Sequence, residues 1–279
     1  MKLQTVLLLF ALGCPLAVQA ETLTIVGSGT VATAITAAIE EFKKTSGVEV
    51  ILTPRGSDLG VLALVEGQAQ IGLTIADVND AQRQLYPAVD FHSTTVGRGA
   101  IYLVVSPDVW DAGMHALSRE QVISVVEKQV TNWTELGGPN VPIRFYHPGG
   151  GTQANFVKWL YGKSTPEFRA KMQRFEGASL ADFAVNVGKN RGSLAALSEH
   201  YHPGESTARK VAILTGDGPI EASSANISSG RYPMSFNLQL ITNGRPQGAA
   251  KVAIEFLLSE QGQALIEGTG YARIPAHPK

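Results

Sequence analysis

Hydrophobic and polar positions along the chain follow two periods, one typical of strands and one typical of helices. Short apolar runs at 23–27 (LTIVG) and 48–52 (VEVIL) are each followed by a turn rich in glycine and serine. Behind each turn, at 31–47 and 57–68, apolar residues recur every three or four positions, which predicts amphipathic helices. The same order returns at 142–162, so the sequence predicts repeated strand–turn–helix units.

The strongest β signal is the unbroken apolar run from Ile101 to Val105. Such a run predicts a central strand that is covered on both faces. A further helix is predicted to begin at Ser118, with Gln121 at the capping-box position. The alternation predicts an α/β fold with mixed, mostly parallel sheets flanked by helices. A second cycle of elements begins near Ser106 and favours two lobes over one sheet.

Residues 1–20 have the pattern of a secretory signal peptide. Lys2 precedes the apolar block 6–13 (VLLLFALG), and Val18 and Ala20 are the small residues that signal peptidase requires. We therefore expect cleavage near Ala20 and a mature chain in the periplasm or outside the cell. Anchoring as a lipoprotein through Cys14 is the second alternative. Cys14 is the only cysteine, so cleavage near Ala20 leaves none for a disulfide.

The charge balance indicates no polyanionic partner. The chain has 23 basic and 24 acidic residues and a formal net charge of −1, which gives no reason to expect nucleic-acid binding. No G-x-S-x-G motif is present, and no cysteine remains for nucleophilic catalysis. His200 and His202 lack a third ligand at a recognisable spacing, so we expect no metal site. The sequence therefore predicts neither an enzyme nor a resident cofactor.

Three glycine-containing turns lie between a predicted strand and a predicted helix: 27–31 (GSGTV), 55–60 (RGSDLG) and 148–153 (PGGGTQ). Free backbone N–H groups at a helix start can bind an anion. Residues 27–32 also fit the G-x-G-x-x-A pattern of a dinucleotide site, which needs an acidic residue at the end of the second strand. Glu49 falls at the start of that strand, so we reject the dinucleotide interpretation. The three turns together favour one shared oxyanion.

The order of these motifs resembles a known family. The segments "VGSGTVATAITAAIEEFKKTSGVEV", "GSDLGVLALVEGQAQIGLT", "VTNWTELGG" with "PIRFYHPGGGTQANF", and the last third from "ISSGRYPMSFNLQLITNG" onward are similar in sequence and order to the PstS-like phosphate-binding proteins of ABC transporters. The resemblance covers essentially the whole mature chain. It implies a periplasmic-binding-protein fold, in which two α/β lobes are joined by two crossing strands near 98–105 and 234–242.

The resemblance also implies where the ligand binds, between the lobes. Hydroxyl and amide groups of the three turns and of the loop after the third strand would hold the oxyanion. These candidates are Thr30, the amide of Val31, Ser57, Thr74, Gly150, Gly151 and Thr152. The chain departs from the family at Gly150, where a serine is expected. It also departs at Ile75, where a carboxylate commonly follows the hydroxyl residue.

The arginine that the family places shortly before the third turn is missing, and His147 is the only candidate replacement in that loop. Candidate charge partners elsewhere are Arg55, Arg98 and Arg191, each of which could instead be a solvated surface residue. Asp77 could be a displaced acceptor for the ligand. Its alternative role, which the sequence favours, is to cap the helix predicted in "DVNDAQRQLY".

Together these observations predict a monomeric, exported solute-binding protein that delivers a small oxyanion, by resemblance phosphate, to an ABC permease in the inner membrane. We expect lobe 1 to comprise 21–104 and 236–279, and lobe 2 to comprise 105–235. The alternative is a sensing or interaction protein on the same fold, with a ligand other than phosphate or with none.

Overall fold

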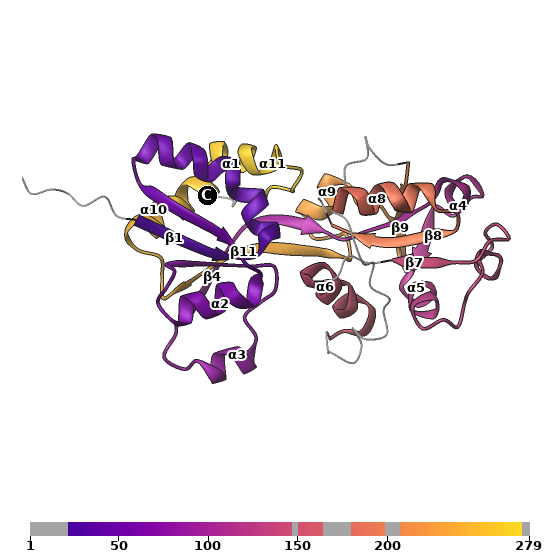
Figure 1. Ribbon diagram of the computed structural model, residues 1–279, viewed down its shortest axis with the longest axis horizontal. Helices are drawn as coiled ribbons and strands as arrows, with labels where there is room; N and C mark the ends of the chain where they lie inside the picture. Colours follow the sequence, from indigo (N-terminus) through magenta and orange to yellow (C-terminus); the bar gives the residue numbers. More distant parts are fainter. Residues whose placement is uncertain (1–21, 147–149, 164–179, 199–206, 275–279) are drawn as a thin grey trace, which may run out of the picture.

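The computed structural model describes residues 22–146, 150–163, 180–198 and 207–274. It has two lobes, each a sheet flanked by helices, joined by a narrow waist (Figure 1). The two-lobed α/β fold expected from the sequence is therefore confirmed. In the part of the chain that the structure describes, no helix is both long enough and apolar enough to span a membrane.

Lobe 1 is built from two separate segments of the chain, and lobe 2 is built from the segment between them. Those of lobe 1 are β1 (Thr22–Gly27), α1 (Gly29–Ser46), β2 (Glu49–Pro54), α2 (Ser57–Val65), β3 (Ile71–Thr74), α3 (Asp80–Leu85), β4 (Phe91–Ala100), β11 (Ser235–Asn243), α10 (Gly248–Leu258) and α11 (Glu260–Glu267). Those of lobe 2 are β5 (Tyr102–Val105), α4 (Pro107–Asp111), β6 (Ala116–Ser118), α5 (Arg119–Val126), the 3-10 turn η1 (Trp133–Leu136), β7 (Arg144–Tyr146), α6 (Gly150–Tyr161), α8 (Leu180–Lys189), β8 (Ser193–Leu197), β9 (Arg209–Thr215), β10 (Gly218–Ile220) and α9 (Ser224–Ser228).

The sheet of lobe 1 has the strand order β2-β1-β3-β11-β4. The sheet of lobe 2 has the order β10-β9-β5-β8-β7, with β6 paired to β9. As predicted, β5 is a central strand, and all four of its residues are buried. The expected capping box at Ser118 and Gln121 is also confirmed at the start of α5.

The sheets are mixed, but the expectation that they are mostly parallel is wrong. In lobe 1, β1 pairs in parallel with β2 and β3, whereas β11 pairs antiparallel with β3 and β4. In lobe 2, β5 pairs antiparallel with both β8 and β9. The reason is that β4 leaves lobe 1 and β11 returns to it, so these neighbours must run in opposite directions. Strand–helix alternation alone does not reveal such a return.

Helix α1 shows how local sequence sets an element and its packing. Its N-cap is Ser28, whose hydroxyl accepts a hydrogen bond from the Val31 amide (3.4 Å). Its apolar stripe includes Ile35, Ile39 and Phe42, which are buried. This stripe packs against the sheet of lobe 1 and against α10 and α11 (Figure 1). The helix ends at Gly47, which adopts the left-handed conformation with φ of 72°.

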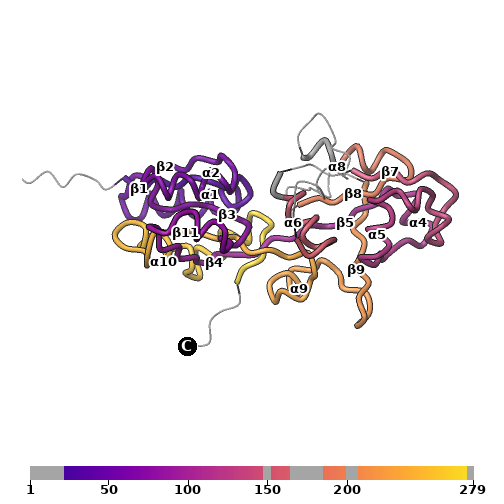
Figure 2. The backbone as a smooth tube through the Cα atoms, turned by 90° about the horizontal axis from the view of Figure 1, so that it is seen from below, coloured from indigo at the N-terminus to yellow at the C-terminus, as the bar shows by residue number. Residues whose placement is uncertain are grey.

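The chain crosses between the lobes twice, at neighbouring places. Strands β4 and β11 pair from Phe91 with Asn243 up to Ala100 with Ser235. Just beyond this ladder, the Ile101 amide donates to the carbonyl of Met234 (3.0 Å). The two crossings run side by side through the waist (Figure 2). The chain therefore links the lobes through a short two-stranded hinge.

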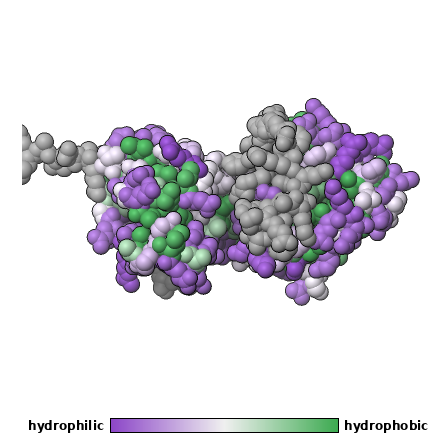
Figure 3. All heavy atoms as spheres, turned by 60° about the horizontal axis from the view of Figure 1, so that its bottom comes forward, coloured by the Kyte–Doolittle hydropathy of each residue, from purple (hydrophilic) through white to green (hydrophobic). Residues whose placement is uncertain are grey.

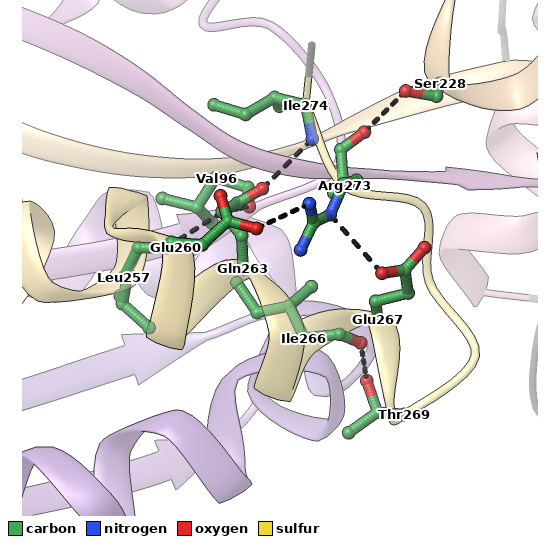
Figure 4. A network of polar contacts seen from close by, with 10 residues as sticks. All are labelled: Val96, Ser228, Leu257, Glu260, Gln263, Ile266, Glu267, Thr269, Arg273 and Ile274. Carbon is green, nitrogen blue, oxygen red and sulfur yellow. Dashed lines mark hydrogen bonds and ion pairs between the residues drawn. The ribbon is translucent and has the colours of Figure 1, made fainter. Parts of the chain in front are cut away.

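The segment after α11 supports this hinge. The Ser228 hydroxyl, at the end of α9, donates to the carbonyl of Arg273 (2.7 Å). The Arg273 guanidinium in turn forms ion pairs with Glu260 (2.9 Å) and Glu267 (3.3 Å) on α11 (Figure 4). Lobe 1 therefore holds the chain on the approach to the second crossing through its C-terminal helix.

Candidate functional site

A cleft of about 1040 Å³ lies between the lobes and is lined by three of the predicted ligand-binding residues and one predicted charge partner. Lobe 1 contributes Thr30, Arg55 and Ser57, and lobe 2 contributes Thr152. In the space-filling view the lobes stand as separate bodies on either side of the waist (Figure 3). The structure thus brings residues that are more than 120 positions apart in sequence to one cleft.

The topology explains why these residues meet. Thr30, Ser57 and Ile75 each follow closely after the carboxyl end of a strand, respectively β1, β2 and β3. These three strands are parallel neighbours, so their carboxyl ends lie at one edge of the sheet. In open α/β sheets, ligands bind outside that edge. From lobe 2, α6 and the carboxyl end of β8 face the same cleft.

The start of α1 offers backbone donors to the cleft. Of its first four amides, that of Ser28 donates to the Leu73 carbonyl (2.9 Å) and that of Val31 donates to the Ser28 hydroxyl. The amides of Gly29 and Thr30 remain without an intrahelical acceptor, as at any helix N-terminus. The Val31 amide, which the resemblance assigned to the ligand, is therefore engaged by the cap in this conformation.

Two glycines, Gly27 and Gly60, allow the turn after β1, helix α2 and strand β3 to pack closely against one another. Gly27 has φ of 146°, and a Cβ atom there would lie 2.7 Å from the backbone nitrogen of Leu73. A Cβ atom on Gly60 would lie 2.8 Å from the Cα atom of Gly27. Any larger residue at either position would separate α2 from the strand ends. The Gly27 carbonyl also accepts from the amides of Arg55 (2.7 Å) and Gly56 (2.8 Å), which joins the first and second turns.

Ser57 connects the second turn to the loop after β3. Its hydroxyl oxygen lies 3.5 Å from the amide of Ile75, which donates to it. The side chain of Ile75 is buried and lines the cleft. At the place where the resemblance predicts a carboxylate, the cleft wall is therefore apolar.

Ser198, which the sequence analysis did not identify, lines the same cleft. It follows β8, is only 3% exposed, and its hydroxyl has no hydrogen-bond partner among the residues that the structure describes. A buried hydroxyl without a partner is costly unless a ligand or water satisfies it. Its position directly after a buried strand was the signal that could have identified it, because carboxyl ends of strands carry ligand groups.

The cleft carries charges of both signs. Arg55 and Lys158 line it and form no ion pair with another residue that the structure describes. Two carboxylates, Glu40 and Asp58, also line it, and Glu40 is paired with Lys43 (3.4 Å). Lys158 lies on α6, two turns after Thr152, and is the cation that lobe 2 contributes. The sequence analysis did not identify this lysine, since it lies outside the loop where an arginine was expected.

A second compartment of about 440 Å³ adjoins the first and shares Ile75, Ala76, Asn155 and Lys158 with it. Two of the predicted charge partners, Arg98 and Asp77, line this second compartment. Asp77 does not cap the following helix, so that expectation is wrong. The N-cap of α3 is Asn79, which forms a capping box with Gln82. The Asp77 carboxylate instead accepts a hydrogen bond from the Gln239 side chain (2.6 Å).

Two further candidates, Thr74 and Arg191, are engaged by other contacts. The Thr74 hydroxyl is used within its own turn, where it donates to the Ala76 carbonyl (2.8 Å). Arg191 is mostly exposed and pairs with Asp108 (3.5 Å). Gly150 and Gly151 form the first residues of α6. His147 lies outside the described residues, as do His200 and His202. Within the described ranges, no group of three or more metal-ligating side chains is present.

Two α/β lobes, a two-stranded hinge and a cleft lined by helix starts define a solute-binding protein. The chain belongs to the PBP superfamily, whose domain model matches residues 16–261. It is 28% identical over 260 residues to the phosphate-binding protein PstS of Bacillus subtilis strain 168, which covers 89% of this chain and 79% of that protein. It is 24% identical over 271 residues to PstS of Pseudomonas aeruginosa, which covers 90% and 82% respectively. The resemblance to PstS-like proteins is thus confirmed.

Solved structures agree on the fold. A putative phosphate ABC transporter substrate-binding protein from Clostridium perfringens, with bound phosphate, superposes with a TM-score of 0.73 at 22% identity. An ABC-type phosphate transport receptor from Vibrio cholerae gives 0.74 at 22% identity. Each comparison covers 91% of this chain and 100% of the other. At this identity the likeness concerns the fold alone.

Proposed function

We propose that this chain is an exported binding protein that captures a small oxyanion, phosphate in the first instance, for uptake by an ABC transporter. The observation that carries the proposal is the cleft between the lobes, where two helix starts of lobe 1, Thr152 near the start of α6 and the buried Ser198 hydroxyl converge. Helix N-termini and hydroxyl groups bind oxyanions. The relatives named above are phosphate-binding proteins, which supports phosphate as the ligand.

The binding mechanism is closure of the lobes around the anion. Thr30 and Ser57 belong to lobe 1, whereas Thr152, Lys158 and Ser198 belong to lobe 2. A ligand that contacts both sets at once gains interactions that only the closed state offers, so it shifts the population towards that state. The anion is bound and released unchanged, and no residue has a catalytic role.

The rest of the proposal concerns processing and partners. Residues 1–20 act as a leader that is removed near Ala20, and the mature chain works in the periplasm as a monomer that docks on a membrane permease. Lobe 1 comprises the segments 21–100 and 235–279, and lobe 2 the segment between them. Strand pairing passes from one sheet to the other after Ala100, which supports a first boundary slightly before residue 104, the boundary expected from the sequence.

A thermal-unfolding screen of the mature chain tests the proposal. The ligands are phosphate, sulfate, molybdate, methylphosphonate and acetate. An oxyanion present at about one hundred times its dissociation constant raises the free energy of unfolding by roughly 2.7 kcal/mol. The expected result is stabilisation by phosphate and no effect of acetate. Absence of a shift with every oxyanion would refute the proposal, and turnover of a chromogenic phosphate ester would favour an enzyme instead.

Three variants test which hydroxyl groups bind the anion. Thr30→Ala, Ser57→Ala and Thr152→Ala each remove one hydroxyl from the cleft, and a hydrogen bond to a charged group contributes about 1.5–3 kcal/mol. We expect each variant to lose roughly ten- to hundredfold in affinity for phosphate. The melting temperature of ligand-free Thr30→Ala and Thr152→Ala should change little, whereas that of Ser57→Ala should fall slightly, because the Ile75 amide loses its acceptor (3.5 Å). Parent-like affinity in all three variants would show that the turns only begin helices.

A further inference from the structure

The compartment beside the anion site has a chemistry of its own. It is lined from lobe 1 by Asp77, Arg98, Asn237 and Gln239, and from lobe 2 by Asn155 and Lys158. Because Asn155 and Lys158 also line the anion cleft, the two compartments are immediate neighbours. An arm on a ligand held by the helix starts would therefore have only these shared residues to pass.

Two charged side chains of this compartment, Asp77 and Arg98, have no ion-pair partner within the described ranges. The Arg98 guanidinium donates through Nη1 to the Ser228 carbonyl (3.1 Å), and its buried Nε has no acceptor among the described residues. The Asp77 carboxylate accepts only the neutral Gln239 amide among the contacts that are described. Neither Asp77 nor Arg98 forms an ion pair with another described residue.

Closure of the lobes makes this arrangement costly unless the ligand completes it. Water leaves the cleft when the lobes approach, and a charge that loses water without gaining a partner is strongly destabilising. An inorganic anion can satisfy the helix starts and Lys158, but it carries no positive group for Asp77 and no second anionic group for Arg98. A ligand arm with one positive and one negative group would satisfy both.

We infer that the preferred ligand is a phosphorylated small zwitterion, in which an oxyanion carries an arm with an ammonium group and a carboxylate. The carboxylate would face Arg98, and the ammonium group would face Asp77. This inference rests on the proposed function, since it places the oxyanion in the same cleft. It also accounts for the apolar Ile75 at the boundary of the two compartments, where the carbon chain of the arm would pass.

Calorimetric titration of the mature chain with four probes tests the inference. The probes are phosphate, phosphoethanolamine with the ammonium group alone, phosphoglycolate with the carboxylate alone, and O-phosphoserine with both. We expect O-phosphoserine to bind at least roughly tenfold more tightly than phosphate, with the other two esters in between. Phosphate binding with weaker or no binding of the esters would overturn the inference and leave the proposed function intact. Failure of all four probes would overturn both.

The variant Asp77→Asn identifies the group that recognises the ammonium. Asparagine keeps an oxygen for the Gln239 contact but removes the charge. Its affinity for phosphoethanolamine and O-phosphoserine should fall about tenfold, whereas its affinity for phosphoglycolate should not fall. The control is Asp217→Asn, which removes a carboxylate from the exposed turn after β9 and should leave all four affinities unchanged. Equal losses for all three esters in Asp77→Asn would contradict the assigned contact.

Discussion

At the scale of single residues, Ile75 has a direct effect on anion selectivity. A carboxylate in an oxyanion site accepts the proton of hydrogen phosphate and repels sulfate, which has no proton to donate. Here the side chain at that position is apolar and buried, and Asp77 lines the neighbouring compartment instead. We therefore expect the parent protein to bind phosphate and sulfate with affinities within about tenfold of each other.

The variant Ile75→Asp should restore the missing discrimination. We expect the ratio of phosphate to sulfate affinity to rise by about a hundredfold, because sulfate would face an unpaired carboxylate. Calorimetric titration with both anions measures the ratio. Ile75→Asn is the matched control, since it has similar size and no charge, and its ratio should stay near that of the parent. A strongly phosphate-selective parent protein would refute this account.

Ser198 gives a second prediction because its hydroxyl has no partner in the described part of the chain. Ser198→Ala should lower affinity for the bound oxyanion by about 1.5–3 kcal/mol, through loss of a hydrogen bond to a charged group. The free energy of unfolding of the ligand-free variant should not fall, because no hydrogen bond within the protein is lost. Isothermal titration and denaturant unfolding measure the two quantities separately.

Ser193, the first residue of β8, provides the matched control. Its hydroxyl donates to the Asn190 carbonyl (2.7 Å). Ser193→Ala should therefore lower the free energy of unfolding by about 1 kcal/mol and leave anion affinity unchanged. If Ser198→Ala instead behaved like Ser193→Ala, Ser198 would be a structural residue.

The residues of the site were only partly predictable from the sequence. Thr30, Ser57 and Thr152 were predictable because each belongs to a turn with a local pattern of its own. Ser198 and Lys158 have no such pattern, and they reach the cleft only because the lobes face one another. Asp77 was misassigned because Asn79, with Gln82 three residues later, forms the stronger capping box.

At the scale of elements, α6 must be held firmly, since it carries Thr152, Asn155 and Lys158 into the cleft. The last turn of α6 is bound to α5 and to Glu127, the residue that follows α5. The Arg119 side chain donates to the Leu160 carbonyl (3.0 Å), and the Tyr161 hydroxyl donates to the Glu127 carboxylate (3.2 Å). Burial, together with the negative charge of Glu127, raises the pKa of Tyr161 to about 12 from its ordinary value of 10.0.

The raised pKa of Tyr161 predicts how the free energy of unfolding changes at alkaline pH. The folded protein holds the phenol proton more tightly than the unfolded chain, so the stabilisation is complete below about pH 10 and is lost as pH rises towards 12. At pH 8, Tyr161→Phe should be less stable than the parent by about 1 kcal/mol. Denaturant unfolding from pH 8 to 12 should show this difference shrinking. A difference that stays constant with pH would contradict the assigned contact.

The elements themselves were predicted more reliably than their pairing. The apolar run at 101–105 and the capping box at Ser118 are local signals, and both correspond to observed elements. Strand direction is not a local property, because it depends on where the chain returns after more than a hundred residues in the other lobe. That return makes β11 antiparallel to both of its neighbours.

At the scale of the whole molecule, the hinge predicts a measurable contraction. A protein that begins at Glu21 has no cysteine, so Lys44→Cys in lobe 1 and Asp217→Cys in lobe 2 can be labelled with a donor and an acceptor dye. Energy transfer between the dyes should rise when saturating phosphate closes the lobes. A pair within lobe 2, Lys189→Cys with Asp217→Cys, should show no change. No change in the first pair despite calorimetric binding would exclude closure as the mechanism.

The place of β11 in its sheet has a consequence for how the chain folds while it is being synthesised. This strand lies between β3 and β4, yet it leaves the ribosome more than 130 residues after β4. Lobe 2, whose strands are contiguous in sequence, can complete its sheet before β11 has been made. Lobe 1 cannot, because β4 has no neighbour in the sheet until β11 arrives, and α1 lacks the covering helices α10 and α11. The first lobe in sequence is therefore the last to fold, and its unfinished sheet stays open until translation is almost complete.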